Sequence, residues 1–201
     1  MPRETFFNLD EDKKKKIIDA AVKEFTENQL HKSRVSSIIK EAGIPRGSFY
    51  QYFEDIDDLY YFVIDETFDK LFDVGYKRAE LTDDLFEYTR LTFDVDIQSY
   101  KNDKRHKFMM NVGKSIGSNI EYLEHHNNKR KHYIMDVLDK MDLSKLKIYT
   151  TEEKIKIYEF LQNIKRMVIQ RSLMNNLSKE ESKIELDFLL NILKNGLLEK
   201  E

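Results

Sequence analysis

The chain of 201 residues has no cysteine, only two prolines and only six glycines. The absence of cysteine excludes disulfides, cysteine-based metal sites and a cysteine nucleophile. Proline and glycine interrupt helices, so their scarcity, with charged residues at 35%, predicts a mostly helical chain. Large apolar residues recur along the whole length, which argues against disorder.

Long apolar runs are also missing. No stretch approaches the roughly 18 apolar residues that a membrane-spanning helix needs. The opening MPRETFFNLDEDKKKK has only Phe6 and Phe7 as an apolar run, unlike a signal peptide. We therefore expect a soluble, cytoplasmic protein with no membrane partner.

Catalytic patterns are scarce as well. No Ser-His-Asp order, paired-carboxylate spacing or phosphate-binding loop is present, so an enzyme is not expected. The stretch EHHNNKRKH contains His125, His126 and His132. Adjacent histidines point in different directions on a helix, and no carboxylate completes a metal-ligand spacing. We expect no metal and no cofactor.

Charge is distributed unevenly. The net charge is -3, but residues 53–100 carry four Lys/Arg against fourteen Asp/Glu. This asymmetry fits two modules with different partners, and it fits a solvated acidic helix face equally well.

Apolar residues recur at helical spacing, and no segment alternates as a strand does. Asp10 or Asp12 is expected to cap a first helix, and Asp55 or Asp57 a long fourth one. Another helix is expected from Thr82 to about Tyr100. Helices over 118–140, 151–175 and 179–198 each begin with a Ser or Thr followed three residues later by Glu, the pattern of a capping box. These segments predict an all-α fold of about nine helices.

The stretch AGIPRGSFYQYF (residues 42–53) combines helix breakers, rings and small polar groups. Gly43 ends a second helix that Ser33 is expected to cap, and Pro45 suits the first turn of a third. Two short helices joined by a glycine-containing turn form a helix-turn-helix. Phe49 and Phe53 lie four residues apart and are expected to face inward with Ile38 and Ile44.

The remaining side chains of the third helix are then free to contact a DNA duplex. Arg46 can pair with guanine or hold a phosphate, and Gln51 can pair with adenine. Gly47 allows close backbone approach. The residues expected outside are Arg46, Ser48, Gln51 and the hydroxyls of Tyr50 and Tyr52, which suit phosphate or base contacts.

The segment from about residue 13 to 65 resembles the TetR family of bacterial transcriptional regulators. The similarity is carried by IIDAAVKEF, VSSIIKEAGIPRGSFYQYF and DDL. The resemblance implies a helix-turn-helix DNA-binding domain over residues 1–54 and a larger helical ligand-binding and dimerisation domain over residues 55–201. The implied DNA-binding residues are Ser33, Arg34, Pro45, Arg46, Gly47, Ser48, Tyr50, Gln51 and Tyr52.

The resemblance also implies a function. A homodimer would bind a palindromic double-stranded DNA operator as a repressor and release it when a small-molecule effector binds. An alternative is a helical adaptor for protein partners with a weakened head. Ile56 stands where the family often has a phosphate-contacting lysine, and Asp55, Asp57 and Asp58 lie nearby; these departures keep that alternative open. They predict weaker or more salt-sensitive DNA binding unless Lys13–Lys16, Lys32 or Arg34 compensate. Two other departures concern the head itself: Gln29 replaces a usual glycine and alters the exit from the first helix, and Ile39 replaces a small residue and implies a rearranged head core.

Two further surfaces are predicted from residue types. Methionine and aromatic groups adapt to apolar ligands, although they are also ordinary core material. The candidate effector pocket comprises Phe93, Tyr100, Phe108, Met109 and Tyr122. The last two helices carry broad apolar faces that a symmetric partner would cover. The predicted dimer interface comprises Tyr158, Leu161, Ile164, Val168, Phe188, Leu189 and Ile192.

Overall fold

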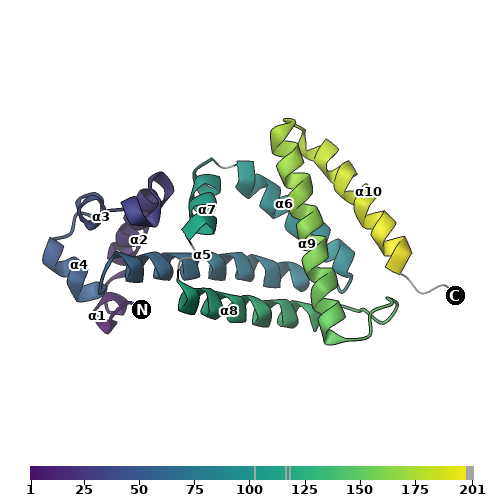
Figure 1. Cartoon of the computed structure of the whole chain (residues 1–201), viewed down its shortest axis with the longest axis horizontal. Coiled ribbons are helices and arrows are strands. Elements are labelled where there is room, and N and C mark those ends of the chain that lie inside the picture. Colours follow the sequence, from purple (N-terminus) through teal and green to yellow (C-terminus); the bar gives the residue numbers. More distant parts are fainter. Residues whose placement is uncertain (102, 116, 118, 198–201) are drawn as a thin grey trace. The chain divides into compact units, whose positions relative to one another are not determined.

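The computed structural model describes residues 1–101, 103–115, 117 and 119–197. Within them all regular structure is helical, with no strand (Figure 1), as the sequence predicts. The elements are α1 (Glu4–Phe7), α2 (Glu11–Glu27), the short 3-10 helix η1 (Leu30–Lys32), α3 (Val35–Ala42), α4 (Arg46–Tyr52), α5 (Ile56–Ala79), α6 (Leu85–Lys101), α7 (Asp103–Ser115), α8 (Ile120–Leu138), α9 (Thr151–Met174) and α10 (Lys179–Leu197).

Ten α-helices therefore occur in the described residues, against about nine predicted. The helices that the sequence analysis missed are α1 and α7. Helix α1 is a single turn, too short to leave a periodic apolar pattern. None of the helices in the described residues is long and apolar enough to cross a membrane.

The chain divides into two compact units. The first unit comprises Met1–Lys70 and Asp103–Asn127, and the second comprises Leu71–Asn102 and Asn128–Glu201. Helices α5 and α8 each contribute residues to both units. The predicted boundary after residue 54 concerns which segment binds which partner, and it stays a prediction.

Local capping fixes three helix ends in the first unit. The Asp10 side chain accepts a hydrogen bond from Lys13 N at 2.8 Å, and α2 begins there as predicted. Asp55 does the same for Asp58 N at 2.8 Å, at the start of α5. Gly43 adopts the left-handed conformation, with φ of 66°, and ends α3. These caps depend on residues within a few positions, which is why the sequence predicts them.

One predicted cap is wrong. Ser33 does not cap α3, because the 3-10 turn η1 uses this residue, and its hydroxyl donates to the Gln29 carbonyl at 3.1 Å. The chain enters α3 through Arg34, whose backbone N–H donates to the Glu24 carboxylate at 2.9 Å. An acidic side chain from α2 thus replaces the expected local serine.

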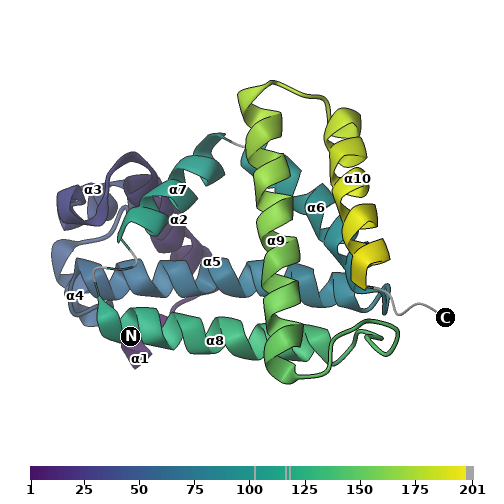
Figure 2. The ribbon, with the colours of Figure 1, turned by 45° about the vertical axis from the view of Figure 1, so that its right-hand side comes forward.

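In the second unit, α9 and α10 form an antiparallel pair beside α6 (Figures 1 and 2). Thr150 and Glu153 form the predicted capping box at the start of α9. Ser178 and Glu181 exchange the equivalent pair of hydrogen bonds at the start of α10. The third predicted box involves Ser118, which lies outside the described residues.

Candidate nucleic-acid interface

The helix-turn-helix is built on a buried aromatic base. Phe49 and Phe53 are fully buried, and Ile38 and Ile44 belong to the same cluster, as predicted. The turn is closed by a hydrogen bond from Ile44 N to the Ile39 carbonyl at 3.0 Å. The inner face of α4 is therefore fixed by packing, and its outer face is left for other contacts.

The outer face of α4 presents Arg46, Gly47, Tyr50 and Gln51, all of which are exposed, with Ser48 half-buried. The Arg46 guanidinium lies over the Tyr50 ring, 5.9 Å from its centroid. Pro45 directly precedes the first turn. A cation, an amide and two hydroxyls thus share one surface, a combination suited to base edges and phosphates.

Tyr52 does not belong to that surface. Only 5% of it is exposed, and its ring lies 6.3 Å from that of Phe6. The prediction placed the Tyr52 hydroxyl outside, but the side chain is buried, because Tyr52 follows Phe49 by three residues and shares its helix face. The Lys13 ammonium lies 5.8 Å from the ring centroid on the outer side.

A second polar surface lies at the entrance to α3. A cavity of about 570 Å³ is lined by Glu24, Asn28, His31, Lys32, Ser33, Arg34 and Ser37. Ser33 and Arg34 were predicted here, whereas His31 and Ser37 were missed. The signal was present in the letters HKSR, which place three basic side chains next to a hydroxyl. Such groups suit a phosphate oxygen.

The acidic start of α5 is largely engaged in capping. The Asp58 side chain accepts a hydrogen bond from Glu54 N at 3.1 Å, and the Asp55 side chain accepts one from Asp58 N. The Asp57 residue is exposed, but neighbouring atoms displace some of the water around its carboxylate, and this desolvation together with the Asp55 charge raises its pKa. Two of these three carboxylates therefore have structural roles at the start of α5.

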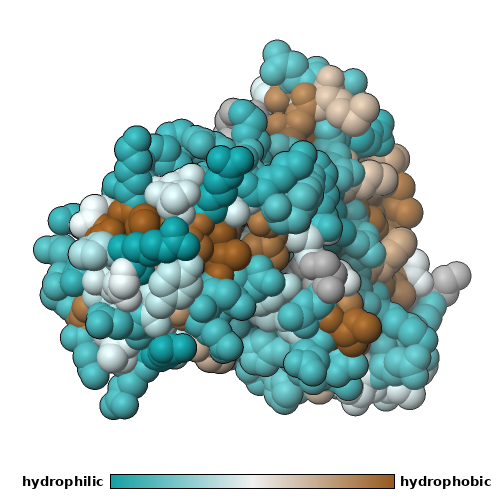
Figure 3. Space-filling view, turned by 60° about the vertical axis from the view of Figure 1, so that its left-hand side comes forward, coloured by the Kyte–Doolittle hydropathy of each residue, from teal (hydrophilic) through white to brown (hydrophobic). Residues whose placement is uncertain are grey.

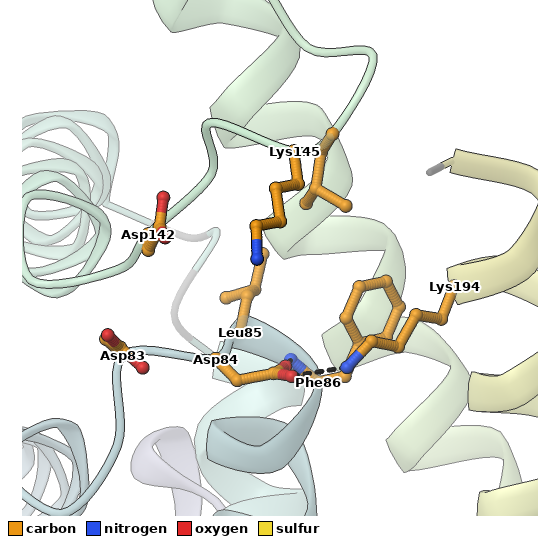
Figure 4. Close-up of a pocket in the computed structure, with 8 residues that line it drawn as sticks. Asp83, Asp84, Leu85, Phe86, Asp142, Lys145 and Lys194 are labelled. Carbon is orange, nitrogen blue, oxygen red and sulfur yellow. Dashed lines mark hydrogen bonds and ion pairs between the residues drawn. The ribbon is translucent and has the colours of Figure 1, made fainter. Parts of the chain in front are cut away.

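The predicted effector-pocket residues are divided between two clusters. Phe93 and Tyr100 pack in the core of the second unit, whereas Phe108, Met109 and Tyr122 pack in that of the first. A cavity in the second unit has a volume of about 300 Å³ and is lined by different residues (Figure 4). They are Asp83, Asp84, Leu85, Phe86, Asp142, Lys145, Leu146 and Lys194. None of the predicted pocket residues lines it.

This cavity is charged at its rim. Lys194 pairs with Asp84 and lies 5.5 Å from the centroid of the Phe86 ring (Figure 4). Burial alone would raise the pKa of Asp84. The Lys194 ammonium and the amides of Glu87 and Phe86 outweigh burial and hold that pKa below its ordinary value.

The predicted dimer residues lie on two different faces. Tyr158, Leu161 and Val168 are buried in the core of the second unit, so assigning them to an interface was wrong. Ile164 and Leu189 are half-buried. Phe188 and Ile192 are exposed, as an interface requires.

Helices α9 and α10 each carry a row of exposed apolar side chains, which together we call the exposed strip; Figure 3 shows apolar surface, in brown, at the right-hand edge of the view. The exposed strip comprises Phe160, Met167, Met174, Ile184, Phe188 and Ile192. Helix α9 carries two apolar stripes, and periodicity alone does not say which one faces the core. The stripe that contains Leu161 and Val168 packs into the core, and the stripe that contains Phe160 and Met167 is exposed.

The histidine-rich stretch does not form a metal site in the part of the chain that the structure describes, where no group of three or more His, Asp or Glu could hold a metal ion. His125 lies 3.5 Å from Asp65, and the Tyr122 hydroxyl donates to the same carboxylate at 2.9 Å. His126 is buried against the ring of Phe68.

DNA-binding helix-turn-helix proteins share a buried helix-turn-helix core and a short second helix with an outward polar face. Residues 17–61 match the family described as Bacterial regulatory proteins, tetR family. The match lies within the segment of about residues 13 to 65 that carries the sequence resemblance to this family.

The comparisons with single proteins agree. The chain is 49% identical over 43 residues to the Fatty acid metabolism regulator protein of Bacillus subtilis (strain 168), a match spanning 21% of this chain and 22% of that protein. Two crystal structures share the fold over 89% of this chain. A TetR family transcription regulator from Marinobacter aquaeolei VT8 has a TM-score of 0.68 and 18% identity, covering 89% of this chain and 94% of that one. The transcriptional regulator FadR from Bacillus subtilis in complex with stearoyl-CoA has a TM-score of 0.66 and 22% sequence identity, covering 89% of this chain and 96% of that one.

Proposed function

We propose that this protein is a ligand-responsive DNA-binding transcriptional regulator, a repressor that a small molecule releases from a palindromic operator. The observation that carries the proposal is α4, a two-turn helix with Phe49 fully buried below and Arg46, Tyr50 and Gln51 exposed above. This helix lies inside the segment that matches the family. The protein acts in the cytoplasm, on the chromosome, and has no catalytic role.

Each group on this face has an assigned role. Arg46 reads guanine or holds a phosphate, and Gln51 reads adenine. Tyr50 and Ser48 donate to phosphates, and Gly47 admits the sugar-phosphate backbone. At the entrance to α3, Lys32, Ser33 and Arg34 hold the neighbouring phosphates, with His31 and Ser37 beside them.

The protein works as a homodimer, because operator palindromy mirrors two-fold symmetry in the protein. The exposed strip of α9 and α10, which includes Phe188 and Ile192, supports this assembly. Exposed apolar strips of this kind mark interaction sites. A symmetric partner presenting the same strip would cover it.

The proposed effector is a long-chain fatty acyl-CoA. Its support is the stearoyl-CoA bound to the B. subtilis regulator of the same fold, and the metabolic name of the relative that matches the head. The cavity of about 300 Å³ in the second unit is at the lower end of the usual size range for small-molecule sites. Acyl-chain binding therefore requires the helices of this unit to open, and the ligand shifts the protein toward that open state.

The DNA-binding proposal is tested by fluorescence anisotropy on the upstream region of the gene, with scrambled DNA as competitor. Arg46→Ala is expected to weaken selective binding by about 1–3 kcal/mol if the side chain reads a base. Lys140→Ala removes an exposed cation from the second unit and serves as the matched control. Absence of sequence-selective binding by the unaltered protein, with no dependence on salt, would instead favour a protein-interaction adaptor.

The effector proposal is tested by titrating stearoyl-CoA into the protein–DNA complex, with stearate and free CoA as separate controls. We expect DNA release with stearoyl-CoA at concentrations where neither control acts. Equal release by stearate alone would identify the acyl chain as sufficient and contradict the acyl-CoA assignment.

A further inference from the structure

The C-terminal end of α4 is capped by a segment distant in sequence. The last four carbonyls of a helix have no partner within the helix. The first of these in α4, that of Phe49, accepts from Phe53 N at 2.9 Å. The other three accept from Arg3 and Thr5. Arg3 Nη1 donates to the Tyr50 carbonyl at 3.0 Å, Thr5 Oγ1 to that of Gln51, and Arg3 N to that of Tyr52 at 2.8 Å.

The segment that supplies these donors is held by aromatic packing. Phe6 is 1% exposed, and its ring centroid lies 4.9 Å from that of Phe53 and 5.3 Å from that of Phe62. Pro2 is buried as well. Residues 2–8, which we call the strap, are therefore fixed against both α4 and the start of α5.

Helix α4 needs such support. A seven-residue helix is too short to be stable alone, because nucleation is unfavourable and only a few hydrogen bonds follow. The Arg3 cation is also favourably placed at the negative end of the helix. Donors on the strap thus determine how the two-turn helix is held at the end opposite its first turn.

We propose that Arg3 and Thr5 are positioning residues for DNA recognition: the strap holds α4 by its last three carbonyls and so orients Arg46 and Gln51 toward base edges. The inference rests on the proposed function. The strap lies outside residues 17–61, so the family match does not include it. Neither positioning residue has to touch DNA in this account.

The test compares Thr5→Val, Thr5→Ser and Arg3→Ala, with Glu4→Ala as the control at an exposed site between them. Thr5→Val and Arg3→Ala each remove one side-chain hydrogen bond, and each is expected to weaken selective DNA binding about three- to ten-fold. Thr5→Ser keeps the hydroxyl and should bind DNA like the unaltered protein. Because valine removes no charge, the slope of log affinity against log salt should stay unchanged for Thr5→Val.

A direct contact between Arg3 and a phosphate gives another pattern and would overturn the proposal. In that case Arg3→Ala lowers the salt slope by about one, and Thr5→Val binds like the unaltered protein. Amide hydrogen exchange separates the strap from the proposed function. Faster exchange at residues 50–53 in Thr5→Val is expected even if the unaltered protein selects no DNA sequence, whereas unchanged exchange there would refute the strap's role.

Discussion

Gly75 shows how a single residue determines packing in the second unit. A Cβ built at this position would lie 1.8 Å from the Tyr133 hydroxyl oxygen. That hydroxyl is hydrogen-bonded to the Tyr88 hydroxyl at 2.7 Å, and the Tyr133 ring stacks on Phe72 at 4.4 Å. A glycine in α5 thus creates the space in which a ring from α8 reaches a hydroxyl from α6.

Gly75→Ala is accordingly expected to destabilise the protein by about 1–3 kcal/mol, the usual cost of overpacking a core. Gly113→Ala is the control, because nothing lies within 4 Å of a Cβ there. That change should be neutral or stabilising by about 0.5–1 kcal/mol, since alanine favours a helix interior. Urea unfolding of both variants provides the measurement, and equal stability would contradict the steric account.

Lys165 is a second residue whose role depends on its partners. Its side chain is 8% exposed, and its ammonium lies 2.6 Å from the Asp96 carboxylate and 3.0 Å from the Thr92 hydroxyl. A buried charge is tolerated only when it is paired. The pair therefore matters most when one partner is removed.

Asp96→Ala is expected to cost about 3–5 kcal/mol, because it leaves a buried ammonium without its counter-ion. The double variant Asp96→Ala with Lys165→Met should recover most of that loss, since methionine fills a similar volume without charge. Thermal unfolding of the two single variants and the double variant measures the coupling. A double variant as unstable as the sum of the singles would contradict the pairing.

At the scale of elements, α10 is joined to α6 by charged pairs. Asp94 accepts both Lys179 at 3.1 Å and Lys183 at 3.0 Å, and Asp187 accepts Arg90 at 2.5 Å. Burial alone would raise the pKa of Asp94, but Lys183 and Lys179 outweigh it and lower the pKa. The pKa of Asp84 is likewise lowered, because Lys194 and the nearby backbone amides outweigh burial. Each pair links the last helix to the helix beside it.

Acid should therefore weaken the attachment of α10. The folded-state pKa values of Asp84 and Asp94 lie below their ordinary value of 3.8, so their stabilisation is present above that pH. It is lost as pH falls through the depressed values. Hydrogen exchange below pH 4 should show α10 losing protection, and Asp94→Asn should remove part of this pH dependence. An unchanged profile in that variant would contradict the assignment.

At the scale of the whole molecule, the exposed strip on α9 and α10 predicts the assembly state. Ile184, Phe188 and Ile192 are 70%, 64% and 55% exposed at four-residue intervals on α10. Placing a charge in the centre of an apolar interface costs several kcal/mol unless the charge is paired.

Phe188→Glu is expected to convert a dimer to a monomer in sedimentation velocity and to weaken operator binding with it. Leu81→Glu alters another exposed apolar residue of the second unit and should leave the dimer intact. A dimer that survives Phe188→Glu would place the interface elsewhere.

The sequence by itself determined the all-helical fold, the helix ends at Asp10, Gly43, Asp55 and Thr150, and the inward pair Phe49 and Phe53. These features arise from residues within about four positions of one another, where hydrogen bonding and helix periodicity act locally.

Only the tertiary structure decided that Glu24 replaces Ser33 at the start of α3 and that Arg3 and Thr5 cap α4. It also decided which stripe of α9 faces the core, with Leu161 buried and Phe160 exposed. In each case the alternatives have equal local propensity. Contacts between residues far apart in the sequence, and the apolar area that they remove from water, distinguish them.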